Sequence, residues 1–202
     1  MKRLLLLLAS SLGLMLPAWS GDLASEIRSR LSQPEVLHGD FEQAKTVSGF
    51  AKPLQSRGDF LVARGRGVLW RTVEPFASEL RLTRDEIKAS QGGSVSFKLD
   101  AAKEPTVRVI NGLMFALLNG DVARLSELFE FSGAAQGKSW NLTLTPKQLA
   151  LARLLKRVEL HGDSLVRRIV LDEANGDVTQ IRFLNQRGEA AALSSADQAR
   201  FD

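Results

Sequence analysis

The chain has 202 residues, of which 44% are hydrophobic and 25% charged, and these proportions fit a globular domain and exclude a disordered chain. It contains no cysteine, which excludes disulfides, thiolate metal sites, a cysteine nucleophile and a lipid anchor on an N-terminal cysteine. Only two histidines are present, which excludes a histidine-rich metal centre. The formal net charge of +4 is small and gives little reason to expect a nucleic-acid partner.

The N-terminus predicts an export signal. Lys2 and Arg3 precede an uncharged apolar run over 4–16. A proline and the small-x-small pattern of residues 18–20, typical of a cleavage site, follow before Gly21. The run is short for a membrane span, so we expect a signal peptide over residues 1–20 rather than an anchor. Its removal takes two basic residues and lowers the net charge from +4 to +2. Because no cysteine lies at the cleavage site, we expect release into the periplasm.

The first half of the remaining chain begins with a helix and continues with short strands. The helix is predicted between the N-cap Asp22 and Pro34, because Leu23, Ile27 and Leu31 recur at helical spacing. From residue 36 the apolar period changes to two, which indicates strands. These are expected at 36–43, 54–62, 67–73, 78–83, 86–90 and 94–99, separated by glycine, proline or charged turns.

Helical spacing returns between Pro105 and Ser132, first over 107–118 and then, after Asn119-Gly120-Asp121, over 122–129. Residues 113–118 are all apolar, so a helix here needs cover on two faces. Periodicity alone leaves two interpretations. The helix is either buried in the core, or it is a lid with one face on the sheet and the other on a cavity or an apolar ligand.

Strands resume in the last third, at 139–145, 154–161, 164–172, 177–184 and 188–193. Asn175-Gly176-Asp177 is a strong hairpin signal between two of them. About ten short strands interrupted once by helices predict a mainly β, α+β fold, with one large antiparallel sheet that curls. We therefore expect an incomplete antiparallel β-barrel of about ten to eleven strands around a helical lid, as one domain over 21–202.

Enzyme chemistry is poorly supported. His38 is predicted on the polar face of a strand and His161 in a turn at a strand end, and the chain has no Gly-x-Ser-x-Gly nucleophile motif. The acidic cluster 172–177 could hold calcium, but it lacks the twelve-residue loop spacing and fits a hairpin turn better. We expect no enzyme activity, no metal and no cofactor.

Arg64 ends an apolar strand just before a glycine turn. It is either a solvated charge at a strand end or a donor at the mouth of a cavity. In the second case its five N–H groups would hold backbone carbonyls of the lid in the closed state.

Several short motifs follow one another along the chain after the signal peptide: a helix followed by Gly39-x-Phe41-x-Gln43-x-Lys45, Leu54-x-Ser56-x-Gly58-x-Phe60, Arg64 before a turn, Leu69-Trp70, Pro75-Phe76, the hairpin after Ile169, Ile181-x-Phe183 and Gly188. Their order resembles the periplasmic outer-membrane lipoprotein carrier (LolA) family, over essentially the whole chain after the signal peptide. In that family an incomplete barrel and a helical lid enclose an apolar cavity for the acyl chains of lipoproteins.

The resemblance implies that Arg64 latches the lid. It also implies a cavity lined by apolar residues of strands and lid, for which the candidates are Phe41, Phe60, Val62, Trp70, Leu80, Leu113, Met114, Leu117 and Leu118. The implied partners are lipoprotein acyl chains or another acylated lipid, an inner-membrane donor complex and an outer-membrane acceptor. No nucleic-acid partner is implied, and we expect a monomer.

The chain also departs from the family pattern. The family's aromatic-rich Trp-Tyr-Asp/Asn-Pro strand is replaced by 93–100, and the chain has no tyrosine. A divergent branch with a different acylated or polyene cargo is therefore expected. The main alternative is a periplasmic sensor or interaction module that binds a protein or lipid partner on the same concave sheet, and an exported hydrolase is the least supported possibility.

Overall fold

The structure is a computed structural model that describes residues 20–100, 102–103, 122–189 and 193–201. The predicted signal peptide, up to residue 19, lies outside the described residues and stays a prediction. The same holds for the predicted lid residues Leu113, Met114, Leu117 and Leu118. Within the described residues, no helix combines the length and the apolar character that a bilayer span requires.

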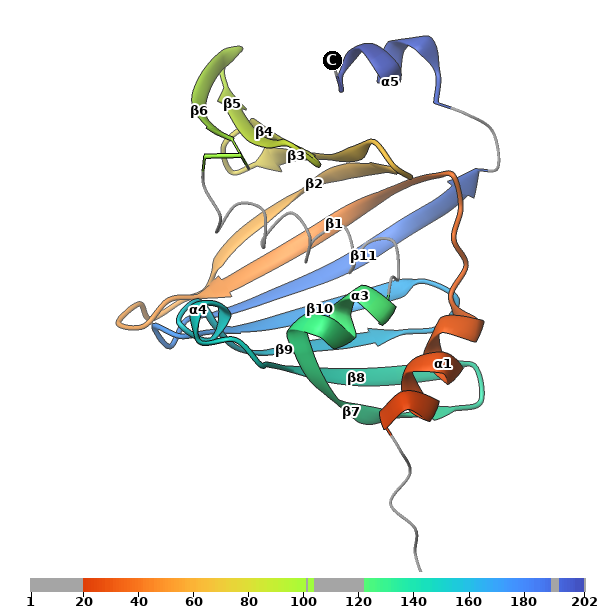
Figure 1. The fold of residues 1–202 in the computed structure, drawn as a ribbon. Helices are drawn as coiled ribbons and strands as arrows, with labels where there is room; N and C mark the ends of the chain where they lie inside the picture. Colours follow the sequence, from red (N-terminus) through yellow and green to blue (C-terminus); the bar gives the residue numbers. More distant parts are fainter. Residues whose placement is uncertain (1–19, 101, 104–121, 190–192, 202) are drawn as a thin grey trace, which may run out of the picture.

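The first half of the chain forms one helix and a meander of six strands (Figure 1). The helix α1 ends before Pro34, as expected, and Ile27 on its apolar face is almost fully buried. The elements are α1 (Ser20–Arg30), β1 (Val36–Thr46), β2 (Leu54–Ala63), β3 (Gly67–Glu74), β4 (Ser78–Thr83), β5 (Glu86–Gln91) and β6 (Ser94–Asp100).

The second half contains the remaining strands and three short helices. Gly176, with φ of 94°, makes the tight turn between β10 and β11, so the hairpin predicted at Asn175-Gly176-Asp177 is confirmed. The elements are α3 (Val122–Leu128), β7 (Phe129–Gln136), β8 (Ser139–Pro146), α4 (Leu149–Ala152), β9 (Leu155–Gly162), β10 (Val166–Glu173), β11 (Val178–Glu189) and α5 (Ser195–Ala199).

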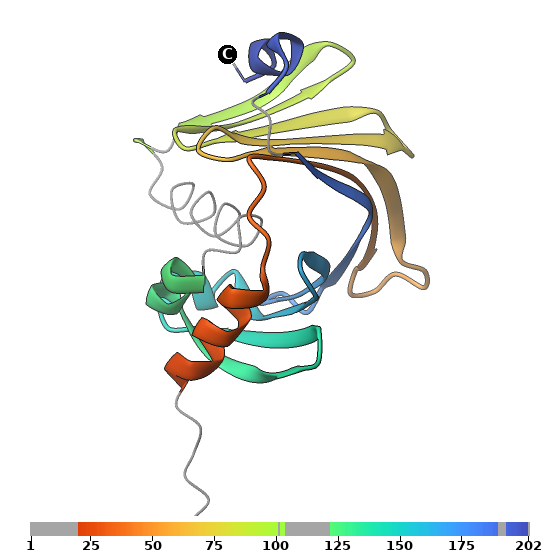
Figure 2. The same cartoon turned by 90° about the vertical axis from the view of Figure 1, so that its right-hand side faces the viewer.

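All eleven strands belong to one antiparallel sheet in the order β6-β5-β4-β3-β2-β1-β11-β10-β9-β8-β7. The first and last strands, β1 and β11, pair in the middle, with Phe41 opposite Phe183, and join the two halves. The sheet curves strongly but stays open, with β6 and β7 at its two edges (Figure 2). The predicted incomplete barrel is therefore confirmed.

The two faces of the sheet carry separate apolar clusters. Because side chains alternate along a strand, Phe60 and Val62 point into the concave side, while Leu61 and Ala63 point outward. The concave cluster is the main core, and α1 and α3 pack against β7 at its lower edge in Figure 2. The outer cluster is small and is covered by Phe201, which follows α5.

The predicted elements differ from the structure at five places. The first helix begins at Ser20, two residues before the predicted N-cap Asp22. Helical spacing was expected up to residue 129 with no strand before 139, but α3 ends at Leu128 and β7 follows at once. A separate strand was predicted at 188–193, but residues 188 and 189 continue β11, so the predicted break before residue 188 is wrong. Residues 190–192 lie outside the described residues. The short helices α4 and α5 were not expected.

Candidate functional site

The concave face is the candidate site, and its centre is a cluster of four aromatic rings. Phe41 and Trp70 stack with ring centroids 3.8 Å apart. Phe60 lies 6.1 Å from Trp70 and meets Phe183 edge-on at 5.1 Å. Offset and edge-to-face contacts at these separations are favourable for aromatic pairs. The rings come from β1, β2, β3 and β11, so they join the two halves of the sheet.

The backbone of β1 makes room for this cluster at Gly39. Gly39 pairs with Phe60 on β2, and a Cβ on Gly39 would lie 2.7 Å from two atoms of the Phe60 ring. The ring therefore packs directly over the glycine backbone. A side chain at this position would push Phe60 out of its place in the cluster.

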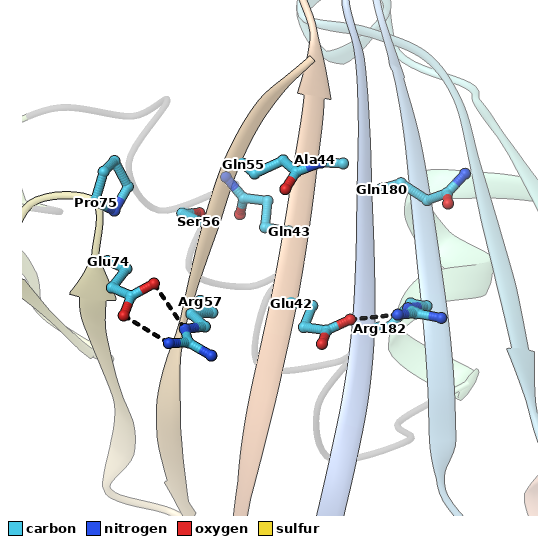
Figure 3. A pocket seen from close by; sticks show the side chains of 10 residues that line it. All are labelled: Glu42, Gln43, Ala44, Gln55, Ser56, Arg57, Glu74, Pro75, Gln180 and Arg182. Carbon is cyan, nitrogen blue, oxygen red and sulfur yellow. Dashed lines mark hydrogen bonds and ion pairs between the residues drawn. The ribbon is translucent and has the colours of Figure 1, made fainter. Parts of the chain in front are cut away.

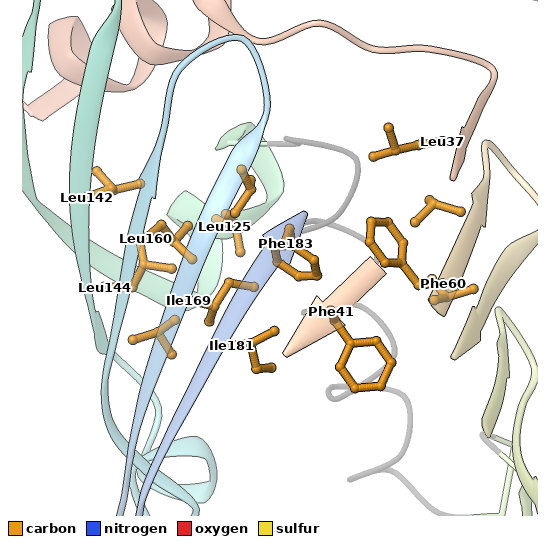
Figure 4. Close-up of a cluster of buried hydrophobic side chains, with 14 of the residues drawn as sticks. Leu37, Phe41, Phe60, Leu125, Leu142, Leu144, Leu160, Ile169, Ile181 and Phe183 are labelled. Carbon is orange, nitrogen blue, oxygen red and sulfur yellow. The ribbon is translucent and has the colours of Figure 1, made fainter. Parts of the chain in front are cut away.

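Aliphatic side chains from β8 to β11 extend the lining away from the aromatic rings. They interleave from neighbouring strands and continue onto Leu125 of α3 (Figure 4). The members that Figure 4 labels here are Leu142, Leu144, Leu160, Ile169 and Ile181. The concave side of the sheet thus holds a continuous apolar cluster whose members are mostly buried.

Five of the predicted cavity residues meet on this face. Phe41, Phe60 and Val62 are buried core members, and Trp70 and Leu80 pack against the same cluster while half-buried. The structure brings these five together; whether they bind lipid stays a prediction. Sequence reasoning left out Phe183 and the β8–β10 aliphatics as site residues, although the alternation Ile181-x-Phe183 was a usable signal.

Arg64 lies at the end of this face where β2 turns into β3. Its guanidinium donates to the carbonyl of Gln33 and lies 3.6 Å from the Glu35 carboxylate, and its backbone N–H donates to the Glu35 carbonyl at 2.9 Å. Arg64 therefore holds the connection between α1 and β1. The side chain is 38% exposed, and its predicted partners in the lid lie outside the described residues.

Two small cavities lie beside this connection, each with about 20 Å³ of space for a water molecule. One is lined by Phe60 and Phe183 and the other by Val62 and Arg64, and Leu37 borders both.

A polar cluster borders the concave face at the opposite end of the strands. Lys45 contacts both Glu173 carboxylate oxygens, at 2.8 and 3.0 Å, and Asp177 at 3.3 Å. The bond to Glu173 raises the pKa of Lys45, and the backbone N–H of Ser48, at 3.1 Å, is the main cause that lowers the pKa of Asp177. Thr179 donates to Glu173 at 3.0 Å. These groups satisfy one another, so the cluster forms a fixed polar border to the apolar lining.

A groove of about 890 Å³ lies on the outer face, between β1, β2, β3 and β11 (Figure 3). Its charged residues are already paired: Arg57 binds Glu74 through two bonds of 2.6 and 2.8 Å, and Arg182 donates to Glu42. The Arg57 bond lowers the pKa of Glu74. Because these charges have partners, the groove is a solvated ion-pair surface rather than a candidate site.

The residues considered for calcium and for catalysis have ordinary structural positions. Those considered for calcium end β10 and form the turn to β11, where the Asn175 side chain accepts from the Asp177 backbone at 3.0 Å and Asp177 binds Lys45. His161 lies inside β9, next to its end, and not in the turn itself. Among the residues with described placement, no group of three acidic, histidine or cysteine side chains could hold a metal ion.

An open, curved antiparallel sheet with an apolar concave face places the chain in the class of half-barrel proteins. The family model for the outer membrane lipoprotein carrier protein LolA matches residues 32–196, so the chain belongs to this family. Membership of this family supports, in general terms, a function in carrying or sorting lipoproteins. None of the curated proteins matches the chain.

Solved structures support the fold. A DUF1329 family protein from Desulfovibrio piger has a TM-score of 0.53 at 11% identity, with 91% of this chain and 95% of that chain covered. A LolA superfamily protein from Nitrosomonas europaea gives 0.48 at 10% identity, covering 89% and 97%. An outer membrane lipoprotein-sorting protein domain from Vibrio parahaemolyticus, described as putative, gives 0.45 at 10% identity, covering 89% and 97%. The comparison of folds rests on the first of these.

Proposed function

We propose that the protein is a periplasmic carrier that shields the acyl chains of lipoproteins, or of a related acylated lipid, and delivers them towards the outer membrane. The observation that carries the proposal is the continuous apolar concave face of an open sheet, in a chain of the LolA family. By the family resemblance, an inner-membrane complex donates the cargo and an outer-membrane protein accepts it.

The chemistry of the lining suits both uptake and release. An acyl chain exposed to water costs about 0.8 kcal/mol for each CH₂ group, so several chains need a carrier to cross an aqueous space. Leucine, isoleucine and phenylalanine side chains contact such chains by dispersion, without directional bonds. The cargo can therefore slide out when an acceptor binds it more tightly.

Lipid binding by the concave face can be tested with a fluorescent fatty-acyl probe and by mass spectrometry of lipids extracted from the purified protein. We expect copurified acylated material and probe binding at about one per chain. Trp70→Gln places a polar group on the lining and should weaken probe binding at least tenfold. Leu184→Gln is the matched control, because Leu184 is 37% exposed and lies outside the concave cluster.

Two results would count against the carrier. One is a purified protein with no extractable lipid and no probe binding, and the other is equal probe binding by both variants. A stable protein complex without lipid in native mass spectrometry would favour the sensor or interaction module instead.

In the proposed carrier, Arg64 is the latch of a lid formed around Leu113, Met114, Leu117 and Leu118. Arg64→Leu should open the lid, so that a single cysteine at position 117 reacts faster with a water-soluble thiol reagent. Arg66→Leu, an exposed arginine in the same turn, is the control. An unchanged labelling rate in Arg64→Leu would limit the role of Arg64 to its contacts with Gln33 and Glu35.

A further inference from the structure

Several turns of the sheet converge at one end, to the left in Figure 1. Because neighbouring strands are antiparallel, the β1–β2 turn, the β10–β11 turn and the α4 segment before β9 all lie at this end. Hydrogen bonds tie these three segments together. The backbone N–H of Ser48 donates to Asp177 at 3.1 Å, and that of Ala174 donates to the Leu154 carbonyl at 3.0 Å. They therefore form one surface.

Large apolar side chains project from this surface into solvent. Phe50 is 63% exposed, Leu54 54%, Leu149 82% and Leu154 42%, and we call these four residues the apolar rim. Phe76, on the β3–β4 turn at the same end, is 73% exposed. Single exposed apolar residues are ordinary, but a group of them on adjacent turns indicates an interaction surface.

Basic residues are interleaved with the apolar rim. The segments 47–54 and 147–156 contain four basic residues and no acidic one: Lys52, Lys147, Arg153 and Lys156. Among the described residues, Lys147 bonds to the carbonyl of Ser126 at 2.8 Å, and the side chains of Lys52, Arg153 and Lys156 have no bonding partner there. The acidic groups of the adjacent β10–β11 turn are both bound by Lys45. The rim therefore presents free positive charge.

The opposite end of the sheet has a different character. Its turns, at 64–66, 84–85, 137–138 and 163–165, carry the basic residues Arg64, Arg66, Arg84 and Lys138 and the acidic residues Asp85 and Asp163. None of the large, exposed apolar side chains of the described residues lies on them. Both ends of the sheet therefore carry basic residues. At the rim these basic residues lie among large exposed apolar side chains, and on the named turns of the other end they do not.

We propose that the apolar rim and its basic residues are a contact surface for an anionic phospholipid membrane. Phenylalanine and leucine at the tips of turns can enter the boundary between headgroups and acyl chains, while lysine and arginine bind the lipid phosphates. The rim side chains come from separate turns, with charges between them. This arrangement suits a fluid lipid surface, whereas a protein partner would need a fixed complementary shape.

The test is co-sedimentation of the purified protein with vesicles, at physiological salt. We expect binding to phosphatidylcholine vesicles with 30% phosphatidylglycerol and little binding to pure phosphatidylcholine. Each basic residue near an anionic surface changes binding about fivefold. Lys52→Gln/Arg153→Gln/Lys156→Gln should therefore lower the partition coefficient at least about tenfold. The matched control removes the same charge at the other end, with Arg66→Gln/Arg84→Gln/Lys138→Gln, and should change binding far less.

Insertion of the apolar side chains needs a second measurement. Because the chain has no cysteine, Phe50→Cys can carry an environment-sensitive dye whose emission should shift to the blue with anionic vesicles. The same dye on Lys138→Cys should not shift. Phe50→Ser/Leu149→Ser should lower partitioning at least about tenfold, relative to Leu184→Ser.

The outcomes separate this surface from the proposed carrier function. Loss of vesicle binding in the rim variants, with acyl-probe binding retained, supports the rim as a membrane surface. Equal loss in the two charge variants, equal binding to both kinds of vesicle, or no vesicle binding overturns it. If vesicles fail to bind but the acyl probe binds, the carrier function stands without the rim.

Discussion

Phe41 and Trp70 stack at 3.8 Å although β2 lies between their strands. Gly58, which pairs with Phe41 on β2, has no side chain, so the two rings can meet over this strand. A Cβ on Gly58 would also lie 1.8 Å from the Arg71 carbonyl oxygen of β3, so this position has no room for a side chain. The stacked pair thus connects β1 to the β3–β6 part of the meander.

Removal of one ring should destabilise the protein strongly. Phe41 is 1% exposed, so Phe41→Ala leaves a cavity and should lower the free energy of unfolding by about 3–5 kcal/mol. Urea unfolding followed by circular dichroism measures this change. Phe76→Ala removes the same side chain from a turn where it is 73% exposed, and it should change the free energy by less than about 0.5 kcal/mol. Equal effects of the two substitutions would contradict the packing described here.

The contact of Phe60 with the backbone of Gly39 gives a second prediction. Gly39→Ala places a methyl group 2.7 Å from the Phe60 ring and should cost about 1–3 kcal/mol in unfolding free energy. The cost should fall in the double variant Gly39→Ala/Phe60→Leu, because the smaller side chain leaves room. A double-mutant cycle by urea unfolding measures the coupling. Additive effects would mean that the methyl group acts through the backbone instead of the ring.

Strand alternation and turn residues were sufficient to predict most of this fold. The alternation in β1 and β2 predicted which side chains line the concave face, and Asn175-Gly176-Asp177 predicted the hairpin that the structure contains. These signals are local, since each depends only on residues a few positions apart.

The errors come from places where the local signal is absent or misleading. Leu128 and Phe129 continue the helical spacing although the helix ends between them, and no glycine or proline marks the change to β7. β11 was divided at residue 184 because its alternation is broken near Asn185, which has a φ of 50°. The pairing of β1 with β11 shifts register at the same place and lets the strand continue.

The candidate site was predicted in part through the family resemblance. It implied Phe41, Phe60 and Trp70 as lining residues, and the structure places their rings together. Lys45 binds Glu173 and Asp177, which lie more than 120 positions further along the chain. Phe201 likewise packs on residues of β1 to β3, more than 120 positions before it. Such contacts depend on the pairing of distant strands, which local patterns do not encode.

The polar cluster at Lys45 predicts a dependence of stability on acid pH. The folded-state pKa of Asp177 is lowered, mainly by the Ser48 N–H and also by Lys45. Its stabilising contribution is therefore present above the unfolded pKa of about 3.9 and is lost as the pH falls through the lower, folded pKa.

Urea unfolding between pH 2.5 and 6 measures this contribution. Asp177→Asn should be less stable than the parent chain at pH 6, and the difference should shrink as the pH falls. Asp85→Asn, at an exposed turn without a bonding partner among the described residues, should follow the parent chain. A constant difference for Asp177→Asn across this pH range would show that the charge of Asp177 does not stabilise the fold.

Because the outer cluster lies on the face opposite the aromatic lining, we expect that a substitution there lowers the free energy of unfolding without changing acyl-probe affinity. Phe201 is 8% exposed and packs with Val36, Leu61 and Leu69, on the face opposite the aromatic lining. The side chain of Ser194 caps α5 by accepting from the backbone of Asp197 at 3.1 Å, and Arg200 pairs with Glu79 at 2.9 Å. These contacts position the end of the chain over the outer sides of β1, β2 and β3.

Phe201→Ala should therefore lower the free energy of unfolding by about 2–4 kcal/mol, because it exposes apolar side chains and leaves a gap beside Gly67. Acyl-probe affinity should stay within twofold of the parent chain, since the sheet separates Phe201 from the concave face. Arg200→Ala is the matched control, and the loss of its half-exposed ion pair should cost no more than about 1 kcal/mol. Urea unfolding and probe titration on the same samples test both statements. A large loss of probe affinity in Phe201→Ala would mean that the two faces are coupled through the sheet.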